Sequence, residues 1–334
     1  MKDTVLKLLP ALPKNTHAVV VGGGTMGADV AVVLARGGCR VTVIDPNESR
    51  RTPLQAHVRQ ALEPLGLARR AERVTAVPTL EAVQWDDVAL VVECIPENLA
   101  MKQQLFAQLV THAPATAVLA SNSSSFPISA IAQGLESRQR MLGLHFFMPA
   151  HLVPLVEVVR GPDTDPAQAD RLCAFMRGCG SVPVLVRKDK PGFLANRLQH
   201  ALAREAFAMI DEGIATPEDV DAAVRFGFGF RYLAAGPVLQ RDHAGLDVHC
   251  AAAATMYPTL SNASEPAQVL RERVAAGRLG MKTGAGFYDW PEERRQAEQA
   301  RYNHLLQQGL ALLASELPPI DTDDLDANPA TTAP

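Results

Sequence analysis

The sequence predicts an α/β domain with a doubly wound parallel sheet, followed by an all-α domain. Three observations support this prediction. Short apolar runs alternate with helical patterns through the first half of the chain, a glycine-rich turn joins the first run to the first helix, and no convincing strand follows residue 190. A length of 334 residues also agrees with two domains.

The first half of the chain contains alternating strand and helix patterns. Residues 17–21 form an apolar, β-branched run, residues 28–36 have a helical pattern, and residues 40–44 form a second strand that ends at Asp45. A further helix is expected over residues 101–110, and further strands over residues 89–94, 118–120, 141–147, 155–159 and 182–186. Because ligands of such sheets bind beyond the carboxyl ends of the strands, polar residues there are candidate site residues: Glu97, Asn122, Ser124, His145 and Glu157.

The second half of the chain changes to helical patterns. Lys190-Pro191-Gly192 interrupts the alternation, and residues 193–212 then place apolar side chains at helical spacing. Thr216 before Pro217 has the pattern of an N-cap followed by proline in the first helical position. Further helices are expected over residues 218–225, 245–256 and 266–276.

These patterns divide the chain into four segments. An extension over residues 1–15 precedes a nucleotide-binding domain at 16–188, a helical domain at 189–317 and a tail at 318–334. The tail is rich in Pro, Asp, Thr and Ala, a composition that favours disorder. The extension lacks a cleavage signature, and the chain has no run of 18 apolar residues. We therefore expect neither a secretion signal nor a membrane partner.

Composition excludes some classes of function. The 32 basic residues against 36 acidic ones give a net charge of −4, whereas proteins that bind nucleic acid through phosphates are usually basic. The 5 cysteines are scattered, with spacings that fit neither a zinc site nor a disulfide framework. These features predict a cytoplasmic protein without a bound metal and without a nucleic-acid partner.

The glycine-rich turn has the G-x-G-x-x-G spacing of dinucleotide-binding folds. Gly22 permits a tight turn, Gly24 lets the backbone approach a pyrophosphate, and Gly27 allows close helix–strand packing. Thr25 and Met26 lie between these glycines, at the start of the helix, where unpaired N–H groups and the helix dipole favour phosphate. Because a strand precedes this turn and a helix follows it, the motif predicts a Rossmann-type domain.

An acidic residue specifies the nucleotide. Asp45 ends the second strand, 18 residues after Gly27, where a carboxylate accepts hydrogen bonds from ribose hydroxyls and repels a 2′-phosphate. Arg50 and Arg51 follow closely and are the alternative holders of such a phosphate. With Asp45 in place we predict NAD rather than NADP, and we place the two arginines on a solvated helix face.

Five ordered sequence blocks resemble the 3-hydroxyacyl-CoA dehydrogenase family over about residues 16–290. The blocks are residues 21–27 (VGGGTMG), 121–125 (SNSSS), 143–149 with 154–159 (GLHFFMP and PLVEVV), 190–197 (KPGFLANR) and 280–288 (GMKTGAGFY). The resemblance implies NAD-dependent, reversible oxidation of a 3-hydroxy group to a 3-oxo group. It also implies a role in fatty acid metabolism and a homodimer formed through the helical domain.

Oxidation of a secondary alcohol requires a base, and histidine has a suitable pKa near neutrality. His145 lies at the end of a predicted strand, and Glu157 follows twelve residues later, on or near the neighbouring strand, where it would orient the ring. The resemblance assigns this catalytic pair to His145 and Glu157. Taken alone, a histidine within Leu-His-Phe-Phe is more often a buried core residue.

The resemblance gives roles to further residues. It makes Ser124 the donor to the reacting oxygen and Asn196 a donor beside the pair, whereas an N-cap or loop serine and an exposed helix asparagine are the structural alternatives. The residues expected on the cofactor side are Glu97, Lys102, Asn122 and Lys282. For the three charged residues among them, the alternative is a solvated position on the surface.

Two departures from the family leave the substrate open. Met148 stands where the family usually has Asn, and the stretch after Asp45 is short and poor in lysine where enzymes of acyl-CoA carry a longer helical insertion. Several blocks after residue 195 look closer to the L-gulonate dehydrogenase (lambda-crystallin) and carnitine dehydrogenase branch, which acts on free 3-hydroxy acids. Arg231 would then bind a carboxylate, unless it is an ordinary surface arginine.

The sequence disfavours two other functional classes. A non-catalytic, crystallin-like NAD-binding protein is disfavoured because Ser124, His145, Glu157 and Asn196 are all present. A decarboxylating dehydrogenase of 2-hydroxy acids normally relies on a catalytic lysine, and the histidine–glutamate pair occupies that role here.

Overall fold

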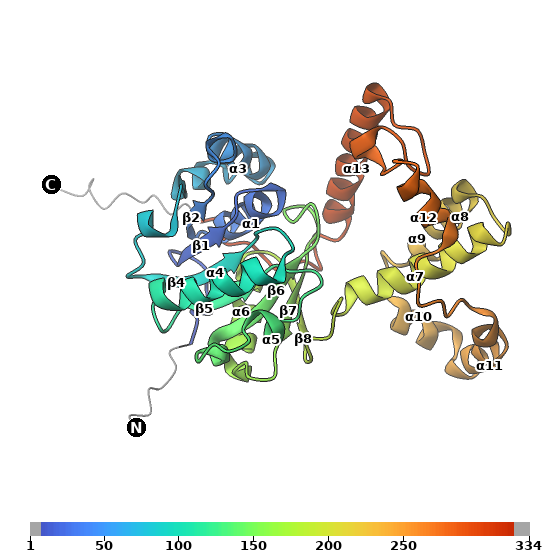
Figure 1. Cartoon of the computed structure of the whole chain (residues 1–334), viewed down its shortest axis with the longest axis horizontal. Coiled ribbons are helices and arrows are strands. Elements are labelled where there is room, and N and C mark those ends of the chain that lie inside the picture. The colour runs from blue at the N-terminus through green and yellow to red at the C-terminus, as the bar shows by residue number, and fades with distance from the viewer. Residues whose placement is uncertain (1–7, 324–334) are drawn as a thin grey trace. The chain divides into compact units, whose positions relative to one another are not determined.

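The computed structural model describes residues 8–323, which fall into two units (Figure 1). The first unit holds the chain up to Leu194 together with the part from Leu310 onward, and the second holds Ala195–Gly309. The first is built on a sheet and the second on helices, as the sequence predicts. The boundary lies six residues after the predicted one at 188, because residues up to Leu194 still contact the sheet unit.

One eight-stranded sheet forms the centre of the first unit, in the order β3-β2-β1-β4-β5-β6-β7-β8. Its strands are β1 (His17–Val21), β2 (Arg40–Ile44), β3 (Val74–Val77), β4 (Val88–Glu93), β5 (Val118–Ser121), β6 (Met141–Phe146), β7 (Leu155–Arg160) and β8 (Val182–Val186). Chain order reverses direction between β1 and β4, so the carboxyl ends of these two strands border the crevice where such sheets bind nucleotides.

The sheet differs from the predicted one in two ways. The pair β6–β7 is antiparallel, whereas all other neighbouring strands are parallel. Only residues 147–154 connect β6 to β7, and a parallel pair needs a crossover of about a dozen residues or more. The short strand β3, Val74–Val77, was not predicted, because it is only four residues long and half of it is only partly buried.

Helices cover both faces of the sheet, and the alternation of strand side chains explains the two core layers. Ala18 and Val20 of β1 belong to one cluster with side chains of the first helices and of residues 166–178, whereas Val19 and Val21 belong to a second cluster with side chains of residues 99–112 and 128–131. The helices of this unit are α1 (Thr25–Arg36), α2 (Glu48–Arg51), α3 (Leu54–Leu62), α4 (Leu99–His112), α5 (Ile128–Ile131) and α6 (Pro166–Gly178).

The second unit contains helices and only two isolated β-bridges among its described residues. Its helices are α7 (Ala195–Asp211), α8 (Pro217–Ala223), α9 (Gly229–Arg231), α10 (Pro237–Ala244), α11 (Leu246–Met256), α12 (Gln268–Ala275) and most of α13 (Glu292–Leu312). Thr216 caps α8 as predicted, in a reciprocal box with Asp219. No helix within residues 8–323 has the length and apolar character needed to span a bilayer.

Parts of the predicted extension and tail pack on the first unit. Leu9 is buried and its N–H donates to Gln168, while Ile320 lies in the space above Gly180 and packs on the core. Arg70 also donates to the carbonyl of Asp321 at 2.6 Å. The assignment of a disordered tail from residue 318 is therefore wrong for residues 318–321, because one isoleucine fits a gap that its composition did not reveal. Residues 1–7 and 324–334 lie outside the described part.

Candidate active site

Three side chains from three strand ends form a continuous chain of contacts. The Nδ1 atom of His145 lies 2.8 Å from Oε2 of Glu157, and its Nε2 atom lies 3.1 Å from Oγ of Ser124. The register of β6 and β7 places His145 directly opposite Glu157. Both side chains are buried, and Ser124 follows β5 in the adjacent loop. The sequence prediction that Glu157 lies on the neighbouring strand is confirmed.

The segment before the second unit fixes the other carboxylate oxygen of Glu157. The backbone N–H of Leu194 donates to Oε1 of Glu157 at 3.0 Å. Phe193 is buried and its ring lies 5.6 Å from that of His145, while Phe147 meets the same imidazole edge-on at 4.5 Å. Sequence reasoning did not give Phe193 or Leu194 a role, although the block at residues 190–197 was the available signal. These contacts hold the histidine–glutamate pair in one orientation.

The glycine-rich turn leaves room for a phosphate group. A Cβ atom on Gly22 would lie 2.7 Å from the carbonyl oxygen of Cys94, and one on Gly27 would lie 1.7 Å from that of Gly22. At Gly24 the nearest atom is Nη1 of Arg50, 3.9 Å away. Gly24 is also the N-cap of α1 and no side chain caps this end of the helix, so the N–H groups that begin at Thr25 and Met26 face a space suited to a pyrophosphate.

Asp45 organises the other side of this turn. Its buried carboxylate accepts hydrogen bonds from the N–H groups of Gly23 and Asn47, each at 2.8 Å. Nη1 of Arg50 lies 3.4 Å from Oδ2 of Asp45, and Arg51 donates to the backbone carbonyl of Asp45. Both arginines lie on the short helix α2, none of whose residues is buried, and the Arg50 side chain is 54% exposed, so they contact Asp45 from the solvent-facing side that the sequence predicts.

Lys102 is buried in a cluster of charged side chains at the carboxyl end of β4. Its Nζ atom lies 2.7 Å from Glu93, 3.2 Å from Glu97 and 3.2 Å from the carbonyl of Ile95. The side chains of Lys102 and Glu93 are 1% and 0% exposed, so a solvated position for Lys102 is excluded. Glu93 also accepts a hydrogen bond from Ser121. The sequence prediction omitted Glu93, although an acid within an apolar strand was a usable signal.

Glu97 holds the loop that contains Ser124. Its Oε1 atom accepts hydrogen bonds from Oγ of Ser123, and from the N–H and hydroxyl of Ser125. Burial raises the pKa of Glu97, but the hydrogen bonds from Ser123 and Ser125 and the charge of Lys102 outweigh it and lower the pKa to about 2. Glu97 is therefore ionised at neutral pH and fixes the residues on both sides of Ser124.

Asn122 contacts the end of β6, and Met148 follows this strand in the chain. Oδ1 of Asn122 accepts a hydrogen bond from the N–H of Phe146, which ties the serine loop to β6. Met148 follows β6 and is 66% exposed, so the thioether presents no polar group where the family usually has an amide. Asn122 thus has a structural contact in addition to its predicted place on the cofactor side.

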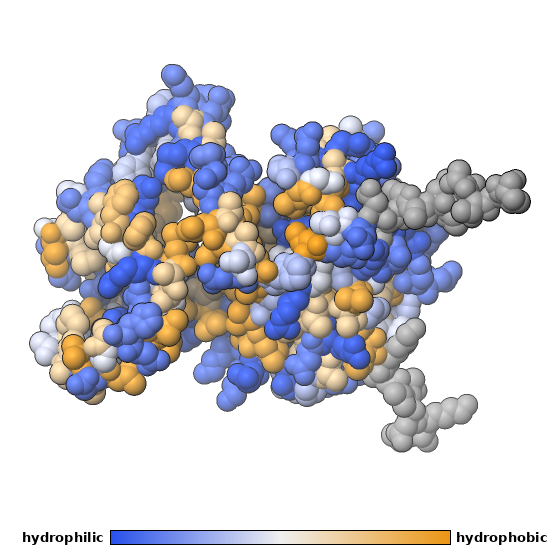
Figure 2. Space-filling view, turned by 180° about the vertical axis from the view of Figure 1, so that it is seen from behind, coloured by the Kyte–Doolittle hydropathy of each residue, from blue (hydrophilic) through white to orange (hydrophobic). Residues whose placement is uncertain are grey.

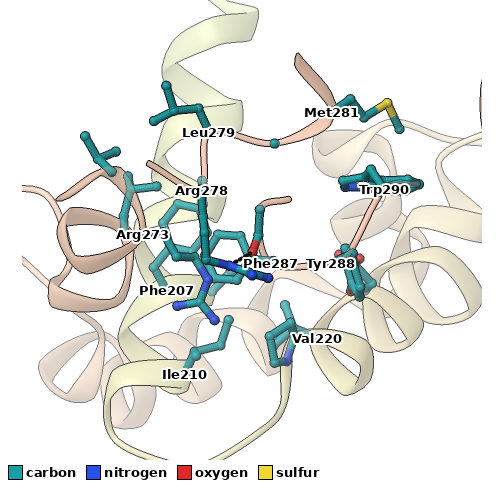
Figure 3. A pocket seen from close by; sticks show the side chains of 18 of the residues that line it. Phe207, Ile210, Val220, Arg273, Arg278, Leu279, Met281, Phe287, Tyr288 and Trp290 are labelled. Carbon is teal, nitrogen blue, oxygen red and sulfur yellow. Dashed lines mark hydrogen bonds between the residues drawn. The ribbon is translucent and has the colours of Figure 1, made fainter. Parts of the chain in front are cut away.

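The remaining predicted site residues belong to the second unit. Asn196 is partly buried in the first turn of α7, and Arg231 and Lys282 are exposed. Lys282 lines an open pocket of about 760 Å³ within this unit (Figure 3). None of the other predicted site residues lines this pocket. The fold therefore groups Ser124 with the histidine–glutamate pair in the first unit. Asn196, Arg231 and Lys282 belong to the second unit.

Aromatic and cationic groups define that pocket. Phe207 and Phe287 stack with ring centroids 5.5 Å apart, and Arg273 lies over the Phe287 ring at 4.1 Å (Figure 3). The hydroxyl of Tyr288 donates to Asp221 at 2.7 Å. Burial and the neighbouring Asp221 carboxylate raise the pKa of Tyr288 to about 12. These contacts explain why the block at residues 280–288 is rich in glycine and aromatic residues: it folds against α7 and α8.

Comparisons with known proteins identify the family. The model of the 3-hydroxyacyl-CoA dehydrogenase NAD-binding domain matches residues 17–190, and that of the C-terminal domain of the same enzymes matches residues 192–290. The chain belongs to the 3-hydroxyacyl-CoA dehydrogenase family. Its members are enzymes that use NAD, and the open glycine turn with Asp45 fits that cofactor.

Relatives in this family differ in their substrates. The chain is 33% identical over 291 residues to the 5-formyl-3-hydroxy-2-methylpyridine 4-carboxylate 5-dehydrogenase of Mesorhizobium japonicum, covering 85% of this chain and 94% of the relative. It is 38% identical over 281 residues to a 3-hydroxybutyryl-CoA dehydrogenase of Mycobacterium tuberculosis, covering 81% and 97%.

Solved structures similar to this chain include enzymes of the same two substrate types. A crystal structure of a dehydrogenase of the same pyridine compound, described as an NAD⁺-dependent dismutase, superposes with a TM-score of 0.82 at 30% identity, covering 90% of this chain and 99% of that one. The (S)-3-hydroxybutyryl-CoA dehydrogenase of Ralstonia eutropha gives 0.68 at 30% identity, covering 84% and 100%.

Proposed function

We propose that the protein reversibly oxidises the 3-hydroxy group of a 3-hydroxyacyl substrate to a 3-oxo group, with NAD as the electron acceptor. The observation that supports this proposal is the chain of contacts from Ser124 through His145 to Glu157. One imidazole nitrogen is held by a buried carboxylate, so the other is oriented toward the serine hydroxyl and toward any alcohol bound beside it.

His145 is the general base of this proposal. Its Nε2 atom receives the proton of the substrate hydroxyl, while Glu157 holds Nδ1–H and stabilises the imidazolium that forms. Ser124 donates a hydrogen bond to the substrate oxygen in both its alcohol and its carbonyl states, and Asn196 is proposed as a second donor. In the reverse direction the imidazolium returns its proton to the same oxygen.

The cofactor is assigned to the crevice beside β1. Gly22, Gly24, Gly27 and the first N–H groups of α1 would hold the pyrophosphate, and Asp45 would accept the ribose hydroxyls. When bound, NAD accepts the hydrogen and two electrons that leave the substrate carbon. Glu97, Lys102 and Asn122 fix the neighbouring loops, and Lys282 is proposed as a further cofactor contact from the second unit.

A second candidate substrate class is a free carboxylic acid. The higher TM-score to the pyridine carboxylate dehydrogenase favours it. The substrate for which that relative is named carries both a carboxylate and a formyl group. In this alternative Arg231 binds the carboxylate, and the same base acts on the reacting oxygen.

The test is NADH formation measured side by side on four classes of substrate. 3-Hydroxybutyryl-CoA is compared with free 3-hydroxybutyrate, with L-gulonate and L-carnitine, and with an aromatic formyl carboxylate. We expect the highest kcat/KM with the thioester and loss of turnover in His145→Gln. A preference for a free acid identifies the second candidate substrate class. Undiminished turnover in His145→Gln overturns the assignment of His145 as the base. Tight NAD binding without any turnover supports a non-catalytic protein.

The second unit supports a homodimer as the quaternary state. Many large apolar side chains are exposed on it, including Phe226, Phe230 and Tyr257, and Figure 2 shows apolar patches on the molecular surface. Patches of this kind are unusual on monomers. Light scattering in solution is expected to give twice the chain mass of 35.8 kDa, and charged replacements of Phe226 and Phe230 are expected to return it to that of one chain.

A further inference from the structure

Two imidazoles and one carboxylate meet in the first unit, outside the proposed active site. Asp29 lies in α1, His57 in α3, and His151 in the segment between β6 and β7. Nε2 of His57 is 2.9 Å from Oδ1 of Asp29, and Nδ1 of His151 is 3.0 Å from the same oxygen. The three ligand atoms all lie within 4.8 Å of one another.

The arrangement is not explained by hydrogen bonding alone. Nδ1 of His151 is buried and lies 3.0 Å from Oδ1 of Asp29 as an ion pair, without the alignment of a regular hydrogen bond. The two imidazole rings stand nearly perpendicular, at 89°, with centroids 5.8 Å apart, so both direct a nitrogen toward the carboxylate without stacking. A bound cation would instead be held by lone pairs of both ring nitrogens and of the carboxylate at once.

The spacing suits a small divalent ion. Two ligands that bind zinc at about 2.0–2.1 Å in tetrahedral geometry lie about 3.3 Å apart. The two nitrogen–oxygen separations need to open by only a few tenths of an ångström, and the two ring nitrogens lie within 4.8 Å of one another. Oδ2 of Asp29 accepts a hydrogen bond from the N–H of Ala150, which fixes the carboxylate as outer contacts do in metal sites. The His57 side chain is 39% exposed, which gives an ion access from solvent.

We propose that Asp29, His57 and His151 bind a Zn²⁺ ion, with water in the fourth position. Two imidazoles with a single carboxylate favour Zn²⁺ over Mg²⁺ and Ca²⁺, which prefer oxygen ligands. The ion would join α1 and α3 to the segment that connects β6 and β7, the strands of His145 and Glu157. Its expected role is structural, because none of its three ligands belongs to the proposed catalytic or NAD-binding set.

Calorimetric titration of the chelator-treated full chain with Zn²⁺ tests this site. His57→Gln and His151→Gln each remove one ligand, and His112→Gln is the matched control because His112 lies on α4, against Trp85. We expect one equivalent of Zn²⁺ in wild type and in His112→Gln, and at least about a tenfold weaker affinity in the two ligand variants. Mg²⁺ is expected not to bind at this site. NAD binding by every variant verifies its fold.

The same titration also yields the outcomes that overturn the site. Equal Zn²⁺ affinity in wild type and in both ligand variants, or no bound equivalent in wild type, contradicts the proposal. If a ligand variant does not fold, X-ray absorption of the Zn²⁺-loaded wild type decides instead. Two imidazoles at about 2.0 Å support the site, and a coordination shell with fewer than two imidazoles excludes it.

Discussion

Glu157 lies directly opposite His145 in the antiparallel β6–β7 pair, and its Oε2 atom is 2.8 Å from Nδ1 of the imidazole. This relationship depends on the short connection between the two strands, which forces them to run antiparallel. In a paired antiparallel register, opposite residues place their side chains on the same face of the sheet. The catalytic pair of our proposal is therefore a direct product of strand pairing.

The first prediction concerns the replacement Glu157→Gln. The amide keeps the size of the side chain but removes the charge that stabilises the imidazolium and selects the tautomer, so kcat should fall by about 10²–10⁴-fold with a smaller change in KM. Steady-state kinetics across pH measure this effect. Glu63→Gln, on the exposed surface of the same unit, is the control. A wild-type rate and pH profile in Glu157→Gln would contradict the proposed pair.

The second prediction concerns the choice between NAD and NADP. In Asp45→Ser the carboxylate that repels a 2′-phosphate is lost, and Arg50, now 3.4 Å from that carboxylate, becomes available to bind one. We expect the ratio of kcat/KM with NADP to kcat/KM with NAD to rise at least about tenfold. The double variant Asp45→Ser with Arg50→Gln should lose most of this gain. An unchanged ratio in Asp45→Ser would remove Asp45 from the ribose site.

The sequence predicted those parts of the site that depend on local chemistry. The glycine turn and Asp45 follow from the spacing of one βαβ unit, and the structure places them as expected. Contacts made over long sequence distances were not predictable in the same way. The N–H of Leu194 reaches Glu157 from 37 residues away, and a backbone donor leaves no side-chain signal in the sequence.

One helix and several contacts between charged side chains were not predicted. Helix α13 escaped detection because its sequence, rich in Glu, Gln and Arg, lacks an apolar face with helical spacing. The pairing of Glu93 with Lys102 was not predictable, because Glu93 ends β4 and Lys102 lies on α4, so only the fold brings the two charges together. The proposed zinc ligands Asp29, His57 and His151 likewise come from three separate elements.

The third prediction concerns the buried ion pair of Glu93 and Lys102. In Lys102→Met the carboxylate of Glu93 remains buried without its cation, so the free energy of unfolding should fall by about 3–5 kcal/mol. The double variant Glu93→Gln with Lys102→Met should recover much of this loss, because it removes the uncompensated charge. Lys14→Met is the control: its pair with Asp321 is exposed, and the expected cost is about 0–1 kcal/mol. Urea unfolding measures all three, and equal losses in Lys14→Met and Lys102→Met would contradict the argument.

The last prediction concerns acid stability and the serine loop. Hydrogen bonds from Ser123 and Ser125, together with Lys102, lower the pKa of Glu97 to about 2, below its ordinary value of 4.5. A carboxyl group with a lowered pKa in the folded state stabilises the fold above its ordinary pKa, and this contribution is lost as pH falls toward 2. Glu97→Gln should therefore be less stable than wild type at pH 6–7, and the difference should close between about pH 4.5 and 2. Ser125→Ala removes one of the donors and should shift the closing of that difference to higher pH. A constant difference between wild type and Glu97→Gln across this range would show that the ionised carboxylate does not hold the loop.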